Sequence, residues 1–159
     1  MKRIQHQQEQ SSRRGAALVE FAVIAPLFMT LVLGTLEIGA ALYGSSVLFQ
    51  SVRGGARLAA MDYHNLIPEG TTGNQKVESD IRNFLKASGI SDEGMTITIT
   101  DVENDSNFDL DDSDNRYRLF RVEATLPYSS VSNFPNRYFS ASELKASLVM
   151  RAGRSSLSN

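Results

Sequence analysis

The fold is decided by an uninterrupted apolar stretch of sixteen residues without a charge, Phe21-Ala-Val-Ile-Ala-Pro-Leu-Phe-Met-Thr-Leu-Val-Leu-Gly-Thr-Leu36. With its apolar flanks the stretch runs from Ala16 to about Tyr43. As a helix this segment rises roughly 40 Å, which exceeds the ~30 Å hydrocarbon core of a bilayer. The stretch therefore predicts a single membrane-spanning helix.

The charges around this helix predict its direction through the membrane. Four cations precede it, and the first cation after it is Arg53. Cations collect on the cytoplasmic side of membrane helices, so we expect a cytoplasmic N-terminus and an extracytoplasmic remainder. A chain of 159 residues has room for such an anchor and one further domain.

A cleaved secretory signal is the main competing interpretation of the same stretch. Against it stand the length of the apolar segment, which exceeds the 7–15 residues of a signal core, and the acids Glu20 and Glu37. The helical spacing of apolar residues also continues beyond the span, at Leu48, Val52, Ala56, Ala59 and Ala60. A cut at the small residues 39–41 stays open as an alternative.

Composition excludes several classes of function. The net charge is −2, and residues 16–159 alone carry 12 basic and 17 acidic side chains, so a nucleic-acid partner is not expected. The chain has no cysteine, and its two histidines, His6 and His64, are far apart. Disulfides and thiolate metal sites are therefore excluded. We expect no enzyme activity, no catalytic residue, no metal, no cofactor and no small-molecule substrate.

The junction before the helix, Arg13-Arg14-Gly15-Ala16-Ala17-Leu18-Val19-Glu20-Phe21, resembles the processing site of type IV prepilins. That resemblance implies a cut by a prepilin peptidase after Gly15, which leaves Ala16 first and Glu20 fifth in the mature chain. The predicted processing site is thus Gly15, Ala16, Glu20 and Phe21. A carboxylate at the edge of a span is costly and often functional. A plain alternative is that Glu20 reaches the headgroups beside the arginines.

A wider set of features resembles the TadE family, the TadE/TadG-like minor pilins (pseudopilins) of the tight-adherence (Flp, type IVc) pilus system. The resemblance rests on spaced residues between about 13 and 60: Glu20, Phe21, Pro26, Gly34, Glu37, Gly39, Tyr43, Arg53 and Arg57. It implies a pilin-like chain in the bacterial inner membrane, with incorporation into a surface pilus left open. The implied partners are a prepilin peptidase, major and minor pilins, the inner-membrane assembly platform and membrane lipid.

Five residues of the span are candidates for subunit assembly: Glu20, Pro26, Gly34, Glu37 and Gly39. Proline kinks a helix and can aid packing in a bundle, or is simply tolerated. The glycines, and the pair Ala40 and Gly44, suit a close contact with another helix. For Glu37 we expect a solvated carboxylate at the outer interface, with a subunit contact as the alternative.

Residues 61–159 predict a small extracytoplasmic α+β domain, after a leader at 1–15 and a transmembrane and assembly helix at 16–60. Residues 72–75 have the pattern of a capping box. A short amphipathic helix follows, with Val77, Ile81, Phe84 and Leu85 on one face and a stop at Gly89. Alternating residues then predict three strands of an antiparallel sheet, at 95–100, 120–126 and 144–150.

Two loops invite a functional interpretation. The acidic segment 103–115 lacks the glycine and glutamate of a calcium loop, since those positions counted from Asp109 hold Asp114 and Phe120. We expect an acidic, solvated connection there. The aromatic residues of segment 128–140 are expected to cover a sheet edge, with a partner surface as the alternative.

The expected function is a minor pilin or pseudopilin that acts through helix packing. An unprocessed single-pass anchor carrying an extracytoplasmic binding or sensor domain is the alternative. Which TadE, TadF or TadG-like role applies is left open.

Overall fold

The computed structural model describes residues 2–61, 70–132 and 142–153, with backbone alone for residues 2–14. The chain divides into two compact units, Met1–Gly39 and Ala40–Asn159. The first unit consists of helix, the N-terminal part of α1 (Lys2–Ala60). The fold is α+β, as the sequence predicts, with a long apolar N-terminal helix, a second helix and a three-stranded antiparallel sheet.

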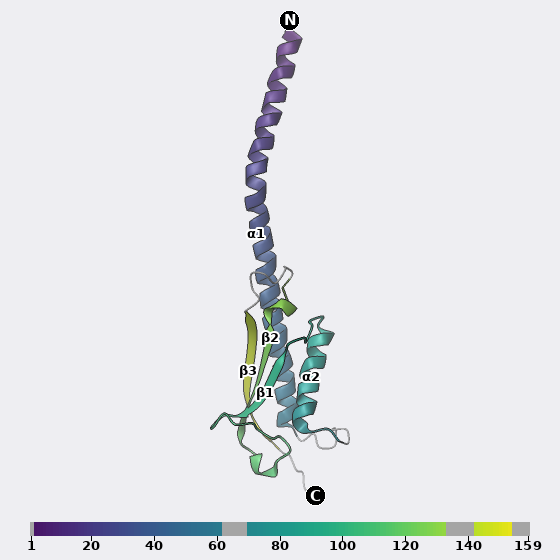
Figure 1. The fold of residues 1–159 in the computed structure, drawn as a ribbon, viewed down its shortest axis with the longest axis vertical. Coiled ribbons are helices and arrows are strands. Elements are labelled where there is room, and N and C mark those ends of the chain that lie inside the picture. Colours follow the sequence, from purple (N-terminus) through teal and green to yellow (C-terminus); the bar gives the residue numbers. More distant parts are fainter. Residues whose placement is uncertain (1, 62–69, 133–141, 154–159) are drawn as a thin grey trace. The chain divides into compact units, whose positions relative to one another are not determined.

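The second unit contains the rest of α1, helix α2 (Gly73–Ala87) and strands β1 (Thr96–Asp101), β2 (Leu119–Pro127) and β3 (Glu143–Arg151) (Figure 1). Two short 3-10 turns flank β2: η2 (Ser113–Asn115) and η3 (Tyr128–Ser130). Within this unit α2 lies beside the last turns of α1, as Figure 1 shows. The boundary of the unit therefore falls inside α1, so this helix contributes to both units.

Helix α2 begins and ends where its local sequence requires. The Thr72 side chain accepts from the backbone N–H of Gln75, and the Gln75 side chain accepts from the backbone N–H of Thr72. This reciprocal pair is the predicted capping box. The helix ends at Ala87, and Gly89 follows with φ +81°, a conformation that glycine adopts without strain.

The three strands form one sheet in the order β1-β2-β3. Val122 of the central strand pairs with Ile99 on one side and Leu148 on the other. Burial alternates along all of β2, so one face is covered and the other carries polar side chains such as Arg121 and Glu123. The predicted alternation and the predicted strand positions are thus confirmed to within a residue or so at each end.

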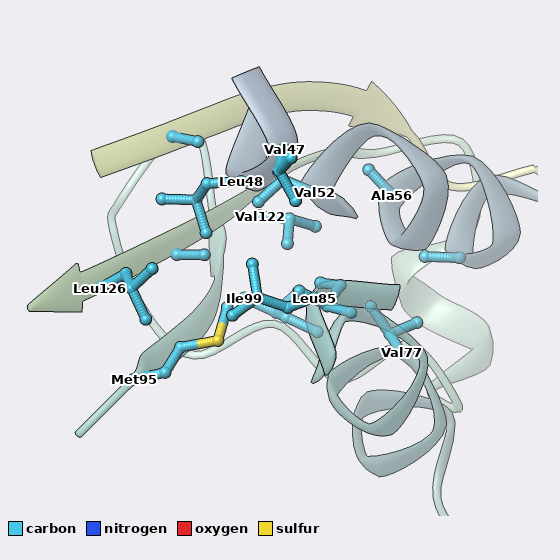
Figure 2. Packing of buried hydrophobic residues seen from close by; sticks show 14 of the residues in the cluster. Val47, Leu48, Val52, Ala56, Val77, Leu85, Met95, Ile99, Val122 and Leu126 are labelled. Carbon is cyan, nitrogen blue, oxygen red and sulfur yellow. The ribbon is translucent and has the colours of Figure 1, made fainter. Parts of the chain in front are cut away.

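Both helices cover the same face of the sheet and form one apolar core (Figure 2). Helix α1 supplies Val47, Leu48, Val52, Ala56 and Ala59, the stripe that continues beyond the span in sequence. Helix α2 supplies Val77, Ile81 and Leu85. Val52, Ile81 and Val122 have no exposed surface, so each contributes the full ~1.5–3 kcal/mol of a buried aliphatic side chain.

Two predicted details of the domain differ from the structure. Phe84 lies at the rim of the helix interface, 46% exposed, because Leu85 occupies the buried position beside Ile81. The acidic segment is not simply a solvated connection, since Phe108 within it is buried and stacks on Phe120 with ring centroids 5.4 Å apart. An aromatic ring inside this polar segment therefore holds it against the core.

The acids of that segment bind their own chain. Asp111 accepts from the N–H of Gly73 at 2.7 Å, at the start of α2. Asp109 and Asp112 each accept from an N–H two residues further on. Just before the segment, Asp101 at the end of β1 is 3% exposed and pairs with Arg118 at 2.5 Å. Turn formation and ion pairing account for these carboxylates, and within the described residues no group of three potential ligands is placed to hold a metal.

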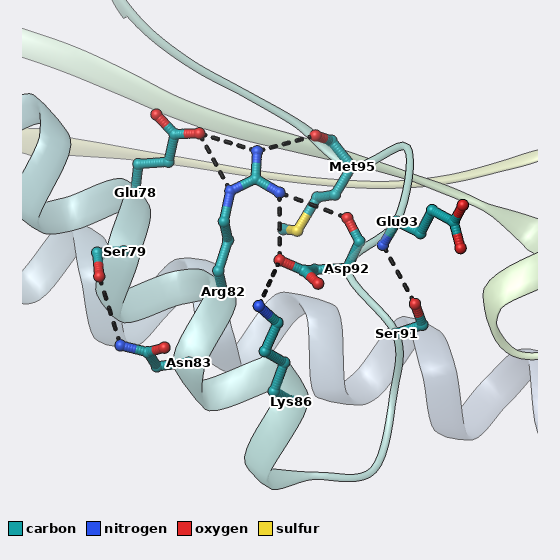
Figure 3. A network of polar contacts seen from close by, with 9 residues as sticks. All are labelled: Glu78, Ser79, Arg82, Asn83, Lys86, Ser91, Asp92, Glu93 and Met95. Carbon is teal, nitrogen blue, oxygen red and sulfur yellow. Dashed lines mark hydrogen bonds and ion pairs between the residues drawn. The ribbon is translucent and has the colours of Figure 1, made fainter.

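A cluster of charged side chains joins α2 to the turn before β1 (Figure 3). The Arg82 guanidinium donates to Glu78 at 2.8 Å and to the Met95 carbonyl at 3.0 Å. Asp92 pairs with Lys86 at 3.1 Å and with Arg82 at 3.5 Å. The Lys86 ammonium holds the pKa of Asp92 below its usual value, with Arg82 adding to the effect. This cluster fixes the direction in which the chain leaves α2.

Part of the predicted loops falls outside the described residues. His64 lies there, in the range 62–69, and so do Phe134, Tyr138 and Phe139 of the aromatic segment. Tyr128 is described, and its side chain is buried with 9% exposed.

Candidate processing and assembly site

The predicted processing site lies within α1. Gly15, Ala16, Glu20 and Phe21 all belong to this one helix, and all four are exposed. Phe21 shows 68% of its surface. The bond between Gly15 and Ala16 is therefore accessible from outside, although its backbone is helical.

The helix that follows is apolar around its whole circumference. Consecutive residues such as Leu18 and Val19 are 69% and 67% exposed, and the pattern continues past Phe28 and Leu36. The described part of the chain contains one helix long and apolar enough to cross a membrane, within Gly15–Ala60, and none of its most apolar window is buried by the protein itself. A helix that is apolar on all sides requires lipid or other helices around it. This segment fits a single-pass membrane protein.

Polar side chains inside the span bond to the helix itself. The Thr30 hydroxyl donates to the Pro26 carbonyl at 2.9 Å, and the Thr35 hydroxyl donates to the Leu31 carbonyl at 2.7 Å. Such bonds remove the cost of placing a free hydroxyl in hydrocarbon. Pro26 is inside α1, and one turn later Thr30 gives its carbonyl an additional partner.

The glycines of α1 fall into two groups. A Cβ added at Gly34 or Gly39 would meet nothing within 4 Å. A Cβ at Gly44 would lie 2.6 Å from Val131 Cγ1, so Gly44 is packed within the chain. The predicted pairing of Ala40 and Gly44 against a neighbouring helix is therefore wrong for Gly44. Gly34 and Gly39 stay candidates for such a contact.

The two acids of the span differ in exposure. Glu20 is exposed, whereas Glu37 is buried with 9% of its surface exposed. The roles expected for both carboxylates stay predictions.

Three contacts that fix the second unit were not anticipated from sequence. Tyr43 donates its hydroxyl to the Ser88 carbonyl at 3.0 Å, which ties α1 to the end of α2. Gly55 allows α2 to approach, because a Cβ there would lie 2.5 Å from Ile81 Cγ1. Asn74 donates to the Phe108 carbonyl at 2.7 Å and accepts from the Leu110 N–H at 3.0 Å. Tyrosine, glycine and asparagine at these positions have no periodic signal, so only spacing in three dimensions identifies them.

Comparison with known proteins finds a family model that is similar to part of the same helix. Residues 15–57 match the model of the TadE family, described as TadE-like protein. The match covers about a quarter of the chain, from the predicted cleavage glycine to Arg57. No curated protein and no solved structure matches the chain.

Proposed function

We propose that this chain, whose residues 15–57 match the TadE-like family model, belongs to the Tad pilus system as a minor pilin or pseudopilin. In this proposal a prepilin peptidase processes it, and it then acts by packing its helix against other pilins. It contributes no chemistry of its own.

One observation carries the proposal: the described part of α1 that follows Gly15 is apolar and exposed on every side. An all-round apolar helix is stable either in lipid or among similar helices. A subunit that leaves the membrane for a fibre needs both environments in turn. The open positions at Gly34 and Gly39, where a neighbouring backbone can approach closely, support the second environment.

The glycine also supports processing. A protease binds its substrate in extended form, so α1 must open locally around Gly15 and Ala16. Glycine inside a helix costs about 1 kcal/mol relative to alanine. Opening at Gly15 is therefore easier than at the alanines that follow it, which favours a cut at this bond.

We propose that Glu20 acts after the cut. Processing creates a cationic α-amino group on Ala16 in an apolar environment, where a bare charge is costly. The exposed Glu20 of a neighbouring subunit offers the opposite charge. Pairing between subunits removes the cost of the unpaired α-amino group and that of the unpaired Glu20 carboxylate. The assembled state is therefore favoured over an isolated helix in lipid.

The proposed location follows from the same helix. The N-terminus lies in the cytoplasm, the span crosses the bacterial inner membrane once, and the second unit is extracytoplasmic. Its proposed partners are the peptidase, the other pilins and the assembly platform.

Sequencing of the mature N-terminus tests the proposal. The full chain is co-expressed with a cognate prepilin peptidase, and in parallel with an inactive form of that peptidase. We expect a start at Ala16 with the active enzyme alone. A chain that begins at Met1 in both cultures would refute processing and favour the unprocessed binding or sensor domain.

A second experiment isolates Glu20. In the Glu20→Ala variant we expect the cut to persist while copurification with other pilins is lost, and Glu20→Asp is the matched control that keeps the charge. Normal pilus formation in Glu20→Ala would show that the assigned role of Glu20 is wrong.

A further inference from the structure

The second unit carries an apolar groove between the last turns of α1 and helix α2. The groove encloses a volume of about 670 Å³. Its walls include Leu58 of α1, Met61 directly after that helix and Phe84 of α2, which are 40%, 47% and 46% exposed. Gly54 lies in the groove as well. Three large, half-exposed apolar side chains therefore line one groove and form a continuous patch. Exposed apolar patches of this kind mark contact sites.

Adjacent glycines make this groove. Gly55 brings α2 close, since a Cβ there would collide with Ile81. Gly54 does the opposite, because a Cβ there would meet nothing within 4 Å. The space beside Gly54 is thus open in the folded chain, and a side chain from outside can reach the backbone of α1 there.

The charges at the groove are of both signs, one on each helix. Arg57 lies on the α1 side, and within the described residues its guanidinium has no ion pair and no hydrogen bond. Asp80 lies on the α2 side and is paired with Lys76 of its own helix. Because Gly55 and Ile81 meet across the two helices, Arg57 and Asp80 lie at nearly the same level along the groove.

We propose that this groove is occupied by the same groove of a second copy of the chain, in a two-fold symmetric contact. In such a contact each surface meets its own copy, so Arg57 of one copy faces Asp80 of the other, twice. The apolar walls then cover one another. The groove thus contains both the cation and the anion that its partner must supply, which favours a second copy over an unrelated protein.

Anchoring makes this contact attainable. Two copies in one membrane share their orientation, and a two-fold axis along the membrane normal preserves it. Confinement to the same bilayer raises the effective concentration of one copy near the other. The proposed contact involves residues 54–61 and 80–84 and does not depend on processing at Gly15.

Cysteine crosslinking tests the proposal, because the natural chain has no cysteine. The variant Leu58→Cys is expressed at full length, in membranes that lack a prepilin peptidase, and oxidised. Ser45→Cys is the control: this exposed residue lies nine positions before Gly54, on the opposite side of α1. We expect Leu58→Cys to form a homodimer at least about fivefold more than Ser45→Cys, since a disulfide needs Cα atoms within ~7 Å.

Two further variants, each made in the Leu58→Cys chain, test the geometry. In Gly54→Leu the new Cβ meets nothing within 4 Å and the rest of the side chain enters the groove. The chain should therefore fold, with an unchanged circular dichroism spectrum, and lose the crosslink. Arg57→Asp and Asp80→Arg should each lower crosslinking by roughly fivefold. The double variant should restore it, because the pair is reversed but kept.

Equal crosslinking of Leu58→Cys and Ser45→Cys, or adducts with other proteins alone, would overturn the second copy as occupant. A crosslink that survives Gly54→Leu, or a double charge variant as weak as the single ones, would overturn the two-fold contact. Because the membranes contain no peptidase, each result is independent of whether the chain is processed.

Discussion

The adjacent glycines of α1 provide a stability measurement in which most terms cancel. Gly54→Ala and Gly55→Ala make the same chemical change, one residue apart, in one helix. Both gain the ~0.5–1 kcal/mol by which alanine favours a helix over glycine. They differ in what the new methyl group meets, so their difference isolates packing.

At Gly55 the new Cβ would lie 2.5 Å from Cγ1 and 2.8 Å from Cδ1 of Ile81. Ordinary contacts begin near 3.4 Å, and Ile81 is fully buried, so α2 or its side chain must move by nearly an ångström. Overpacking of this kind costs about 1–3 kcal/mol. At Gly54 there is no such cost. We therefore expect Gly54→Ala to be more stable than Gly55→Ala by about 1–3 kcal/mol, with the natural chain between them or close to Gly55→Ala.

The assay is urea unfolding of the full chain in detergent, followed by near-ultraviolet circular dichroism of the second unit. The single variants are compared with Ile81→Ala and with the double variant Gly55→Ala/Ile81→Ala. We expect the double variant to lose about 1 kcal/mol less than the sum of its parts, since the smaller side chain frees the space. If Gly55→Ala is as stable as Gly54→Ala, the close approach of α2 to α1 at this point is wrong.

Three other predictions concern the second unit. Phe108→Ala should destabilise it by about 3–5 kcal/mol, because the ring is buried against Phe120, and urea unfolding measures the loss. Asn74→Ala should cost about 1–3 kcal/mol, since two backbone groups lose their partner, and limited proteolysis should cut the acidic segment faster. The lowered pKa of Asp92 means that its pairing with Lys86 stabilises the fold above its unfolded pKa near 4, and that this stability is lost as pH falls through the lower folded value. Asp92→Asn should therefore flatten the fall in melting temperature below about pH 4, and an unchanged profile would contradict this assignment.

The elements of the fold were predictable because each has a local cause. The capping box at Thr72 and the left-handed Gly89 bound α2 without help from the rest of the chain. The alternation of apolar and polar residues in β2 could be recognised in the sequence, because a sheet covered on one face imposes a period of two. The apolar stripe of α1 that contains Val52 could be recognised in the same way, because a helix covered on one side repeats its apolar residues at helical spacing.

What the sequence did not reveal depends on contacts between distant segments. Phe108 stands among acids with no periodic neighbour, and its burial follows from the position of Phe120. Gly44, Gly54 and Gly55 look alike in sequence, yet one meets Val131, one meets Ile81 and one meets nothing. A glycine in a helix signals either a close approach or open space, and only the packed structure decides between them.

The candidate processing site stays a prediction from the sequence. The order of Gly15, Ala16, Glu20 and Phe21 is a motif, and the family match begins at the same glycine. The inward position of Gly44 required the fold, because an apolar helix offers no polar face from which its buried side can be read.

The share of α1 in the core has a consequence for the order in which the protein folds. Val47 to Ala59 are synthesised early, whereas the central strand that covers them, Leu119–Pro127, emerges much later. Contacts between such distant segments form slowly, because a long loop must close first. Until the sheet has formed, the apolar stripe of α1 stays uncovered, and the chain is prone to aggregate. We expect the nascent chain to depend on a chaperone or on the membrane itself during this interval.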